Sequence, residues 1–342
     1  LGRETPPRRF LSSGVSLCVL LWEEEIVKNR WLIALSAVGI HVCIGSVYAW
    51  SVLTKPIMRE MGFTLGETTW AFSLAILFLG LSAGFLGSFA ERLGPRRSGF
   101  VSAGFFGTGL LGTALALHLH SLWLLYLCYG CIGGIGLGIG YITPVSTLVK
   151  WFPERRGFAT GLAIMGFGFA SLIAGPVMRY LTDTFGLTGN FLILAVIYTT
   201  VIAFSASYLA PPRPGDVDPA ERLSPGRCPD VQSSVSMSGP QYTRKQALHT
   251  WQFYTLWGIF FINITCGIGL LAVASPMAQE TVGMTSAAAA SMVGIIGLMN
   301  GFGRIAWSTV SDRIGRGNVY ILFFLLEIFA FLQLSKVSDA AA

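Results

Sequence analysis

The residue whose type and position most strongly suggest chemistry is Arg304. It lies in the run NGFGRIAWSTVSDRIGR, residues 300–316, which is mostly apolar and rich in glycine as far as Asp312. On a helix that rises 1.5 Å per residue, Arg304 lies about 12 Å before Asp312 and shares a face with Asn300, one turn earlier. A guanidinium forms two parallel hydrogen bonds with a carboxylate, so this pair predicts a site for an organic anion.

The composition predicts that these residues lie within a membrane. The 342 residues are 53% hydrophobic and only 12% charged, and the mean hydropathy is +0.64. Apolar runs of about 20 residues recur along the chain and lack the alternation of a membrane-spanning strand. We therefore predict an all-α polytopic membrane protein with about nine spans, at 31–53, 69–89, 97–117, 122–147, 157–180, 188–209, 253–275, 287–310 and 318–335.

Depth in the membrane bears on the role of Arg304. In a hydrocarbon core about 30 Å thick, Arg304 is deeper than a simple loop anchor needs to be. Its side chain can still reach toward the membrane surface, and such snorkelling is the alternative to a binding role. Because burial of a cation costs free energy, charged residues within spans usually face a cavity or a bundle interior. We therefore favour substrate binding.

The basic residues predict the orientation of the chain. Most of the 23 Lys and Arg residues fall in segments on the side of the N-terminus, whereas Lys55, Arg59, Arg179 and Lys336 fall on the opposite side. Because short basic loops tend to stay in the cytoplasm, the N-terminus is predicted to be cytoplasmic, and the plasma membrane is the expected location. The net charge of +6 is therefore a topology signal, and nucleic-acid binding is not expected.

The chain contains an internal repeat with an offset of about 220 residues. Similar residues begin and end the first span of each half, and similar charged loops follow the second span. The matched positions are Trp31 with Trp251, Pro56 with Pro276, and AERLGPRR at 90–97 with SDRIGRG at 311–317. A parallel duplication explains all three matches.

This repeat predicts a division into two unequal halves. We expect a six-helix bundle over 29–209 and an incomplete bundle of three helices over 250–342. Residues 210–249 are rich in proline and serine, which predicts a flexible cytoplasmic linker. Residues 1–28 are expected to form a disordered or membrane-surface leader, with a cleaved signal peptide as the alternative.

One charged motif occurs in both halves, where the second span of each half ends. Its first copy consists of Gly87, Glu91, Arg92, Gly94, Arg96 and Arg97. Its second copy has Ser308 in place of the first glycine, followed by Asp312, Arg313, Gly315 and Arg316. Opposite charges at a helix end can tie neighbouring helices together, which predicts a latch that breaks during conformational change. Topology anchors with no further role are the alternative.

These motifs resemble the loop signature of the major facilitator superfamily, which implies a bundle of twelve helices, six in each half. A narrower resemblance to the oxalate/formate antiporter family, relatives of the monocarboxylate transporters, runs from about residue 29 to 335. The segments that carry it are KWFPERRGFATGLAIMGFG at 150–168, GSVYAWSV at 45–52 and NGFGR at 300–304. The last three of the usual twelve helices have no counterpart here, so the resemblance implies a six-plus-three arrangement.

The resemblance also implies a function. It indicates secondary transport of small mono- or dicarboxylates, such as oxalate, formate, lactate or pyruvate, by alternating access, with Arg304 receiving the carboxylate. Monocarboxylate porters commonly have an acid where this chain has Asn300, and oxalate-type members use a lysine that has no counterpart here. Coupling to a proton or to a counter-anion therefore stays open, and a non-transporting or regulatory relative is the alternative.

Other polar residues within the spans are weaker candidates for substrate contact. Tyr48, Trp50, Tyr141 and Asn263 fall on helices that line the cavity in the superfamily, and aromatic walls suit a small carboxylate. His41 is interpreted as a helix-contact histidine rather than a proton carrier. The sequence contains no phosphate-binding loop, nucleophile triad or metal-ligand cluster, so we expect neither an enzyme nor a cofactor.

Glycines predict close helix packing. Gly130, Gly134 and Gly138 recur every four residues, and Gly157 and Gly161 lie near the start of the next span. Small residues at this spacing let two helices approach backbone to backbone in a membrane. We therefore expect packing faces here rather than substrate contacts.

Overall fold

The computed structural model describes residues 28–153, 156–212, 242, 244–334 and 336, and the regular secondary structure in this part of the chain is all helical. The predicted leader, except for Lys28, and most of the predicted linker lie outside the described residues. The helices are α2 (Arg30–Ile44), η1 (Gly45–Ala49), α3 (Trp50–Met61), α4 (Leu65–Leu93), α5 (Pro95–His118), α6 (Leu122–Leu125), η2 (Tyr126–Gly133), α7 (Gly134–Trp151), α8 (Arg156–Tyr208), α10 (Arg244–Ala247), α11 (Trp251–Thr281), α12 (Ser286–Ile314) and α13 (Arg316–Leu334).

The predicted all-α fold with membrane-spanning helices is confirmed. Eight helical segments in the described residues are long and apolar enough to cross a membrane. One of them, α8, has 53 residues and would be about 80 Å long if straight, more than twice a bilayer core. Its backbone leaves helical geometry at Gly186, with φ 72° and ψ 176°, so α8 comprises two of the nine predicted spans.

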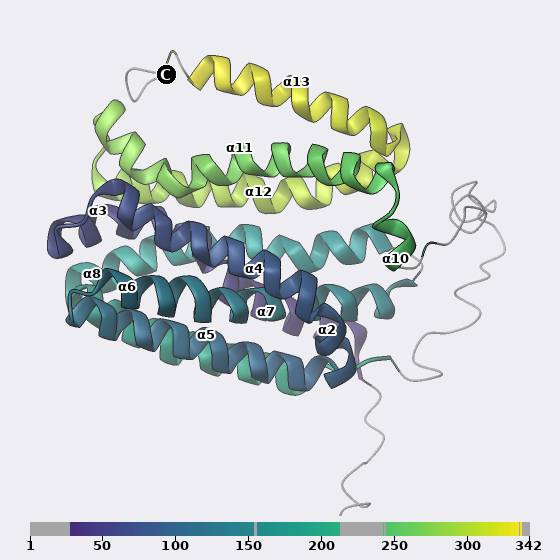
Figure 1. Cartoon of the computed structure of the whole chain (residues 1–342), viewed down its shortest axis with the longest axis horizontal. Helices are drawn as coiled ribbons and strands as arrows, with labels where there is room; N and C mark the ends of the chain where they lie inside the picture. The colour runs from purple at the N-terminus through teal and green to yellow at the C-terminus, as the bar shows by residue number, and fades with distance from the viewer. Residues whose placement is uncertain (1–27, 154–155, 213–241, 243, 335, 337–342) are drawn as a thin grey trace, which may run out of the picture.

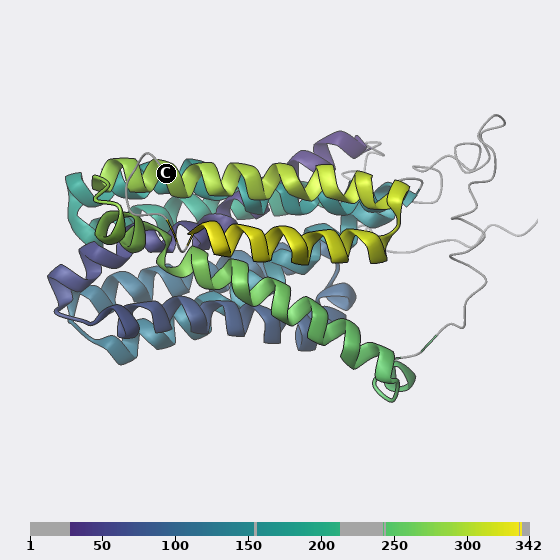
Figure 2. The same ribbon diagram turned by 90° about the horizontal axis from the view of Figure 1, so that it is seen from above.

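The helices form one elongated bundle. In Figure 1 the long helices run in one common direction, with α11, α12 and α13 on one side of the helices from the first half. Figure 2 shows the start of α11 diverging from the other helices at one end of the bundle. The first span is built from α2, η1 and α3 in succession, so a short 3₁₀ segment interrupts it near the middle.

The internal repeat is visible in the backbone geometry. Helices α4 and α12 each have 29 residues, and each begins after a threonine whose side chain accepts a hydrogen bond from the backbone N–H three residues later, at 3.2 Å. A glycine with a positive φ angle lies two residues before each of these threonines, and another directly follows each helix. These matched positions are Thr64 with Thr285, Gly62 (φ 71°) with Gly283 (φ 71°), and Gly94 (φ 81°) with Gly315 (φ 86°).

The two halves meet mainly through α8 and α12, which approach backbone to backbone. A Cβ atom added to Gly168 on α8 would overlap the backbone of Gly301 on α12. A Cβ atom added to Gly301 would lie 2.8 Å from the Phe169 ring and 3.1 Å from the Met165 carbonyl oxygen. In a bilayer, where apolar helix faces gain little by leaving lipid, such close packing holds helices together.

The glycine-rich spans do pack closely, but on other helices and not on each other as predicted. Gly130, Gly134 and Gly138 pack against α4. Gly161, in contrast, packs against α12, where an added Cβ atom would lie 3.2 Å from the Arg304 carbonyl oxygen. The glycine face that begins α8 therefore serves the interface between the two halves.

This interface yields a prediction about stability. Gly301→Leu is expected to destabilise the folded protein by about 1–3 kcal/mol, because the larger side chain overpacks the contact with α8. The measurement is the thermal unfolding midpoint of the purified protein in detergent. Gly104→Leu on α5 is the matched control, because a Cβ atom there has nothing within 4 Å. Equal midpoints for the two variants would contradict tight packing between α8 and α12.

Candidate substrate site

Arg304 lies on α12 and points toward the first half of the chain. Its Nε atom donates a hydrogen bond to the Asn300 side-chain oxygen at 3.0 Å, so the two predicted residues are in contact. Its guanidinium lies near the Tyr48 side chain on η1 and near His41 on α2. Arg304 is half-buried. The structure therefore brings three predicted site residues together, namely Arg304, Asn300 and Tyr48.

An aromatic cluster from the first half surrounds this point. The Tyr48 ring lies 4.7 Å from the Phe167 ring, edge to face, and the Tyr141 ring lies 5.5 Å from Phe167 in the same geometry. His41 contacts both Tyr141 and Phe167, at 5.5 Å and 6.3 Å between ring centroids. Four side chains from α2, η1, α7 and α8 thus converge opposite Arg304, and Tyr141 is a fourth predicted residue in the group.

The position of Tyr48 depends on a close backbone contact. A Cβ atom added to Gly45, the first residue of η1, would lie 2.5 Å from the Phe167 carbonyl oxygen on α8. Only glycine allows the first span to approach α8 so closely. The 3₁₀ segment that follows carries Tyr48 against the Phe167 ring and toward Arg304.

His41 is fully buried, and only one of its ring nitrogens has a hydrogen-bond partner. Nδ1 lies 3.1 Å from the Ala37 carbonyl oxygen, one turn earlier on the same helix. Nε2 faces the backbone of Tyr141 without forming a hydrogen bond of normal geometry. The interpretation of His41 as a helix-contact histidine is therefore incomplete, because one of its two ring nitrogens forms no hydrogen bond.

Neither His41 nor Phe167 is among the predicted site residues. A sequence signal exists for His41, because it precedes Tyr48 by seven residues, or about two helical turns, and so shares its face. Phe167 gives no such signal, because its place in the cluster depends on how α8 is rotated against the first span.

Two predicted substrate contacts lie elsewhere. Trp50 is 1% exposed, and its ring packs 4.2 Å from Tyr129 and 6.4 Å from Phe191 inside the first bundle. Asn263 on α11 donates a hydrogen bond to Glu327 on α13 at 3.2 Å. Within the described residues neither side chain forms a hydrogen bond or ring contact with Arg304, so we leave both out of the candidate site.

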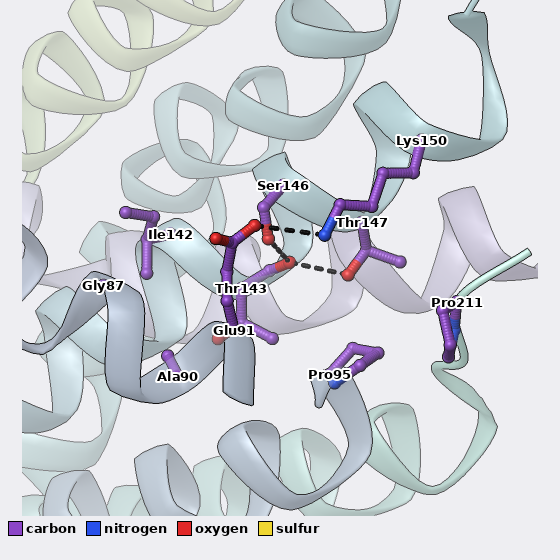
Figure 3. Close-up of a pocket in the computed structure, with 10 residues that line it drawn as sticks. All are labelled: Gly87, Ala90, Glu91, Pro95, Ile142, Thr143, Ser146, Thr147, Lys150 and Pro211. Carbon is purple, nitrogen blue, oxygen red and sulfur yellow. Dashed lines mark hydrogen bonds and ion pairs between the residues drawn. The ribbon is translucent and has the colours of Figure 1, made fainter. Parts of the chain in front are cut away.

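The first copy of the charged motif lies beside a small cavity, shown in Figure 3. Glu91 at the end of α4 forms an ion pair with Lys150 at the end of α7, with 3.1 Å between Oε1 and Nζ. Both side chains are more than half exposed. Gly87 and Pro95 also line the cavity, together with Ala90, Ile142, Thr143, Ser146, Thr147 and Pro211. Lys150 was not predicted as a partner, although it lies in the KWFPERRG junction.

Most of the remaining residues of the charged motif are exposed, and the side chains of two of them lie outside the described part of the structure. Arg92, Arg96 and Arg97 are exposed around the left-handed turn at Gly94. In the second copy, Gly315 and Arg316 are exposed at the turn between α12 and α13. The side chains of Asp312 and Arg313 lie outside the described part of the structure.

At the opposite end of the bundle, an ion pair joins the two halves directly. Lys55 on α3 lies 3.1 Å from Glu280 on α11, and the lysine side chain is only 19% exposed. Gln279 donates a hydrogen bond to Ser275 and accepts one from Ser286, which ties α11 to the start of α12. This connection between halves was not predicted from the sequence.

Comparison with known proteins identifies relatives of this arrangement. The Major Facilitator Superfamily profile matches residues 34–340. The chain is 28% identical over 289 residues to the uncharacterized MFS-type transporter YhjX of Escherichia coli K12, covering 84% of this chain and 68% of YhjX. It is 27% identical over 298 residues to the oxalate:formate antiporter of Oxalobacter formigenes, covering 85% of this chain and 65% of the antiporter. The chain thus spans about two thirds of the length of these relatives.

Solved structures show the same fold. A bacterial homolog of the human lysosomal transporter Spinster, in an inward-facing and unoccupied conformation, superimposes with a TM-score of 0.60 at 16% identity, over 85% of this chain and 64% of that one. A D-xylose-proton symporter superimposes with a TM-score of 0.54, also at 16% identity, over 84% and 70%. This chain is therefore a multi-pass integral membrane protein that belongs to the Major Facilitator Superfamily.

Proposed function

We propose that the protein is a secondary active transporter of small organic anions, mono- or dicarboxylates such as oxalate, formate, lactate or pyruvate, that works by alternating access. The observation that carries the proposal is the position of Arg304, which is half-buried and lies near the Tyr48 side chain of the other half. The oxalate:formate antiporter among its relatives supports an anionic substrate.

The geometry around Arg304 suits a carboxylate. The hydrogen bond to Asn300 occupies the guanidinium Nε–H and fixes the plane of the group, which leaves four N–H donors on the two terminal nitrogens. Two of these can bind both oxygens of a carboxylate in the bidentate arrangement. The Tyr48 and Tyr141 hydroxyl groups can hydrogen-bond the ligand, and Phe167 supplies an apolar wall.

We further propose that the charged motif acts during the conformational cycle. The Glu91–Lys150 pair joins α4 to α7, which both belong to the first half, so it organises that half rather than bridging the two. The exposed arginines of the same loop are available to meet the Asp312 loop of the second half when this end closes. The Lys55–Glu280 pair holds the opposite end, so the two ends would open in turn.

The orientation and location of the chain are also proposals. The excess of basic residues on the side of Arg30, Arg92 and Lys150 supports placing that side, and with it the N-terminus, in the cytoplasm. The plasma membrane is the proposed location.

Arg304→Ala is expected to weaken carboxylate binding at least 30-fold, because removing one partner of a buried charged contact costs about 2–5 kcal/mol. Arg304→Lys is expected to retain little affinity, because lysine keeps the charge and loses the two-pronged donor set. The measurement is titration calorimetry of the detergent-purified protein with oxalate, formate, lactate and pyruvate.

Arg59→Ala, at an exposed position on α3, is the matched control and should bind like the parent protein. A folded Arg304→Ala variant that binds the same anions within about twofold of the parent would identify Arg304 as a snorkelling anchor.

A tag inserted in the 210–249 linker is expected to be accessible only from the cytoplasm, because that segment carries five basic residues. The measurement is protease or antibody access in sealed right-side-out and inverted vesicles. Access only from the outside would reverse the proposed orientation and the assignment of the charged motif to the cytoplasmic end.

Lys150→Ala is expected to change the free energy of unfolding by less than about 1 kcal/mol, because an exposed ion pair contributes little to stability. If the charged motif acts as a latch, Lys150→Ala and Arg92→Ala reduce the rate of carboxylate uptake into proteoliposomes more than they reduce binding. Arg179→Ala breaks the exposed Arg179–Asp183 pair outside this motif and serves as the control. Parallel losses of folded protein and of uptake would indicate structural anchors instead.

A further inference from the structure

The hydrogen bond at Nδ1 fixes which tautomer His41 adopts. A carbonyl oxygen can only accept a hydrogen bond, so the 3.1 Å contact with the Ala37 oxygen requires a hydrogen on Nδ1. In the neutral imidazole the other nitrogen, Nε2, then carries a lone pair and no hydrogen. This nitrogen is the buried atom that lacks a hydrogen-bond partner. His41 therefore has one ring nitrogen without a hydrogen-bond partner, and its lone pair can accept a proton.

The groups that surround His41 include a cation but no carboxylate within the described structure. Arg304 faces it from α12, Tyr141 and its backbone from α7, Tyr48 from η1 and Phe167 from α8. A proton on Nε2 would place a second positive charge near Arg304, on a side chain that is itself fully buried. Two like charges at a buried site oppose each other, so an anion is needed to stabilise both.

We propose that His41 takes up a proton when a carboxylate binds at Arg304, so that one proton and one carboxylate group enter the site together. The proposal rests on the carboxylate function proposed above and adds the group that holds the coupled proton. The proton comes from the solution on the side where the anion binds, forms an Nε2–H bond, and leaves with the anion. Net charge at the site is thus unchanged by joint binding.

The coupling follows from linkage. The bound carboxylate stabilises the imidazolium, and the imidazolium equally strengthens carboxylate binding, because the two effects share one coupling free energy. Asn300 cannot hold a proton in this way, since an amide does not titrate near neutral pH. The imidazole of His41 is the group of this cluster whose type binds a proton near neutral pH.

Counting protons tests this proposal. Pyruvate, whose carboxyl group is fully ionised between about pH 6 and 8, is titrated calorimetrically into the detergent-purified full chain in phosphate and in Tris buffers. The difference in binding heat between buffers of unequal ionisation enthalpy gives the number of protons taken up. The parent protein is expected to take up close to one proton, and its affinity should fall about tenfold per pH unit where uptake is complete.

His41→Gln keeps a polar side chain of similar size and does not titrate, so it is expected to bind pyruvate with no proton uptake and with little pH dependence. His41→Asn is the second variant, used if the first does not fold. His118→Gln changes an exposed histidine at the end of α5 and should behave like the parent.

Binding by the parent without proton uptake would overturn this proposal and leave the carboxylate site intact. Undiminished proton uptake by His41→Gln would also overturn it. If the parent binds none of the carboxylates, the proposed function itself fails, and the proposal about His41 fails with it.

Discussion

The backbone contact between α8 and α12 is the constraint on which the rest of the site depends. Gly168 and Gly301 bring the two helices so close that neither position has room for a side chain. Arg304 follows Gly301 by three residues, so the rotation of α12 that buries Gly301 also determines which way Arg304 points. With wider spacing between the helices, the guanidinium would move away from Tyr48, and lipid or water would separate the halves.

The environment of Arg304 explains how an apolar span tolerates a cation. Asn300 satisfies one donor from within the same helix, and the Tyr48 side chain of the other half lies nearby. The neighbouring aromatic rings present polarisable faces and exclude water without introducing a carboxylate. An internal ion pair would neutralise the guanidinium permanently. Within the described residues no carboxylate pairs with Arg304, so in the proposed site its charge is available to an external anion.

Much of the fold could be predicted from the sequence, because spans, caps and repeats are local patterns. The hydrophobic runs located the helices, and the duplicated loop motif indicated matched turns, now seen at Gly94 and Gly315. Contacts between helices were harder to predict. Lys55 and Glu280 lie more than 200 residues apart, and nothing in the sequence around either residue indicates that their side chains form an ion pair.

The site residues that could be predicted are those whose contacts are local. Arg304 and Asn300 form a pair on one helix, so helical spacing alone predicts their contact. His41 shares a face with Tyr48, but its importance depends on an unpartnered nitrogen that only atomic geometry reveals. Trp50 has the residue type expected of a cavity wall, yet it packs into the first bundle, because the 3₁₀ segment changes the direction of the residues that follow.

The internal repeat makes the site asymmetric in a way that suits transport. At the offsets of 221 and 220 residues, Arg304 corresponds to Ala83, and Tyr48 corresponds to Ile268. Each half thus carries only one part of the proposed site: the cation belongs to the second half, and the hydroxyl and imidazole groups belong to the first. A small anion can satisfy both parts only by bridging the halves. Its binding free energy therefore depends on how the halves are arranged, and differential affinity of this kind is what allows a ligand to shift a conformational equilibrium.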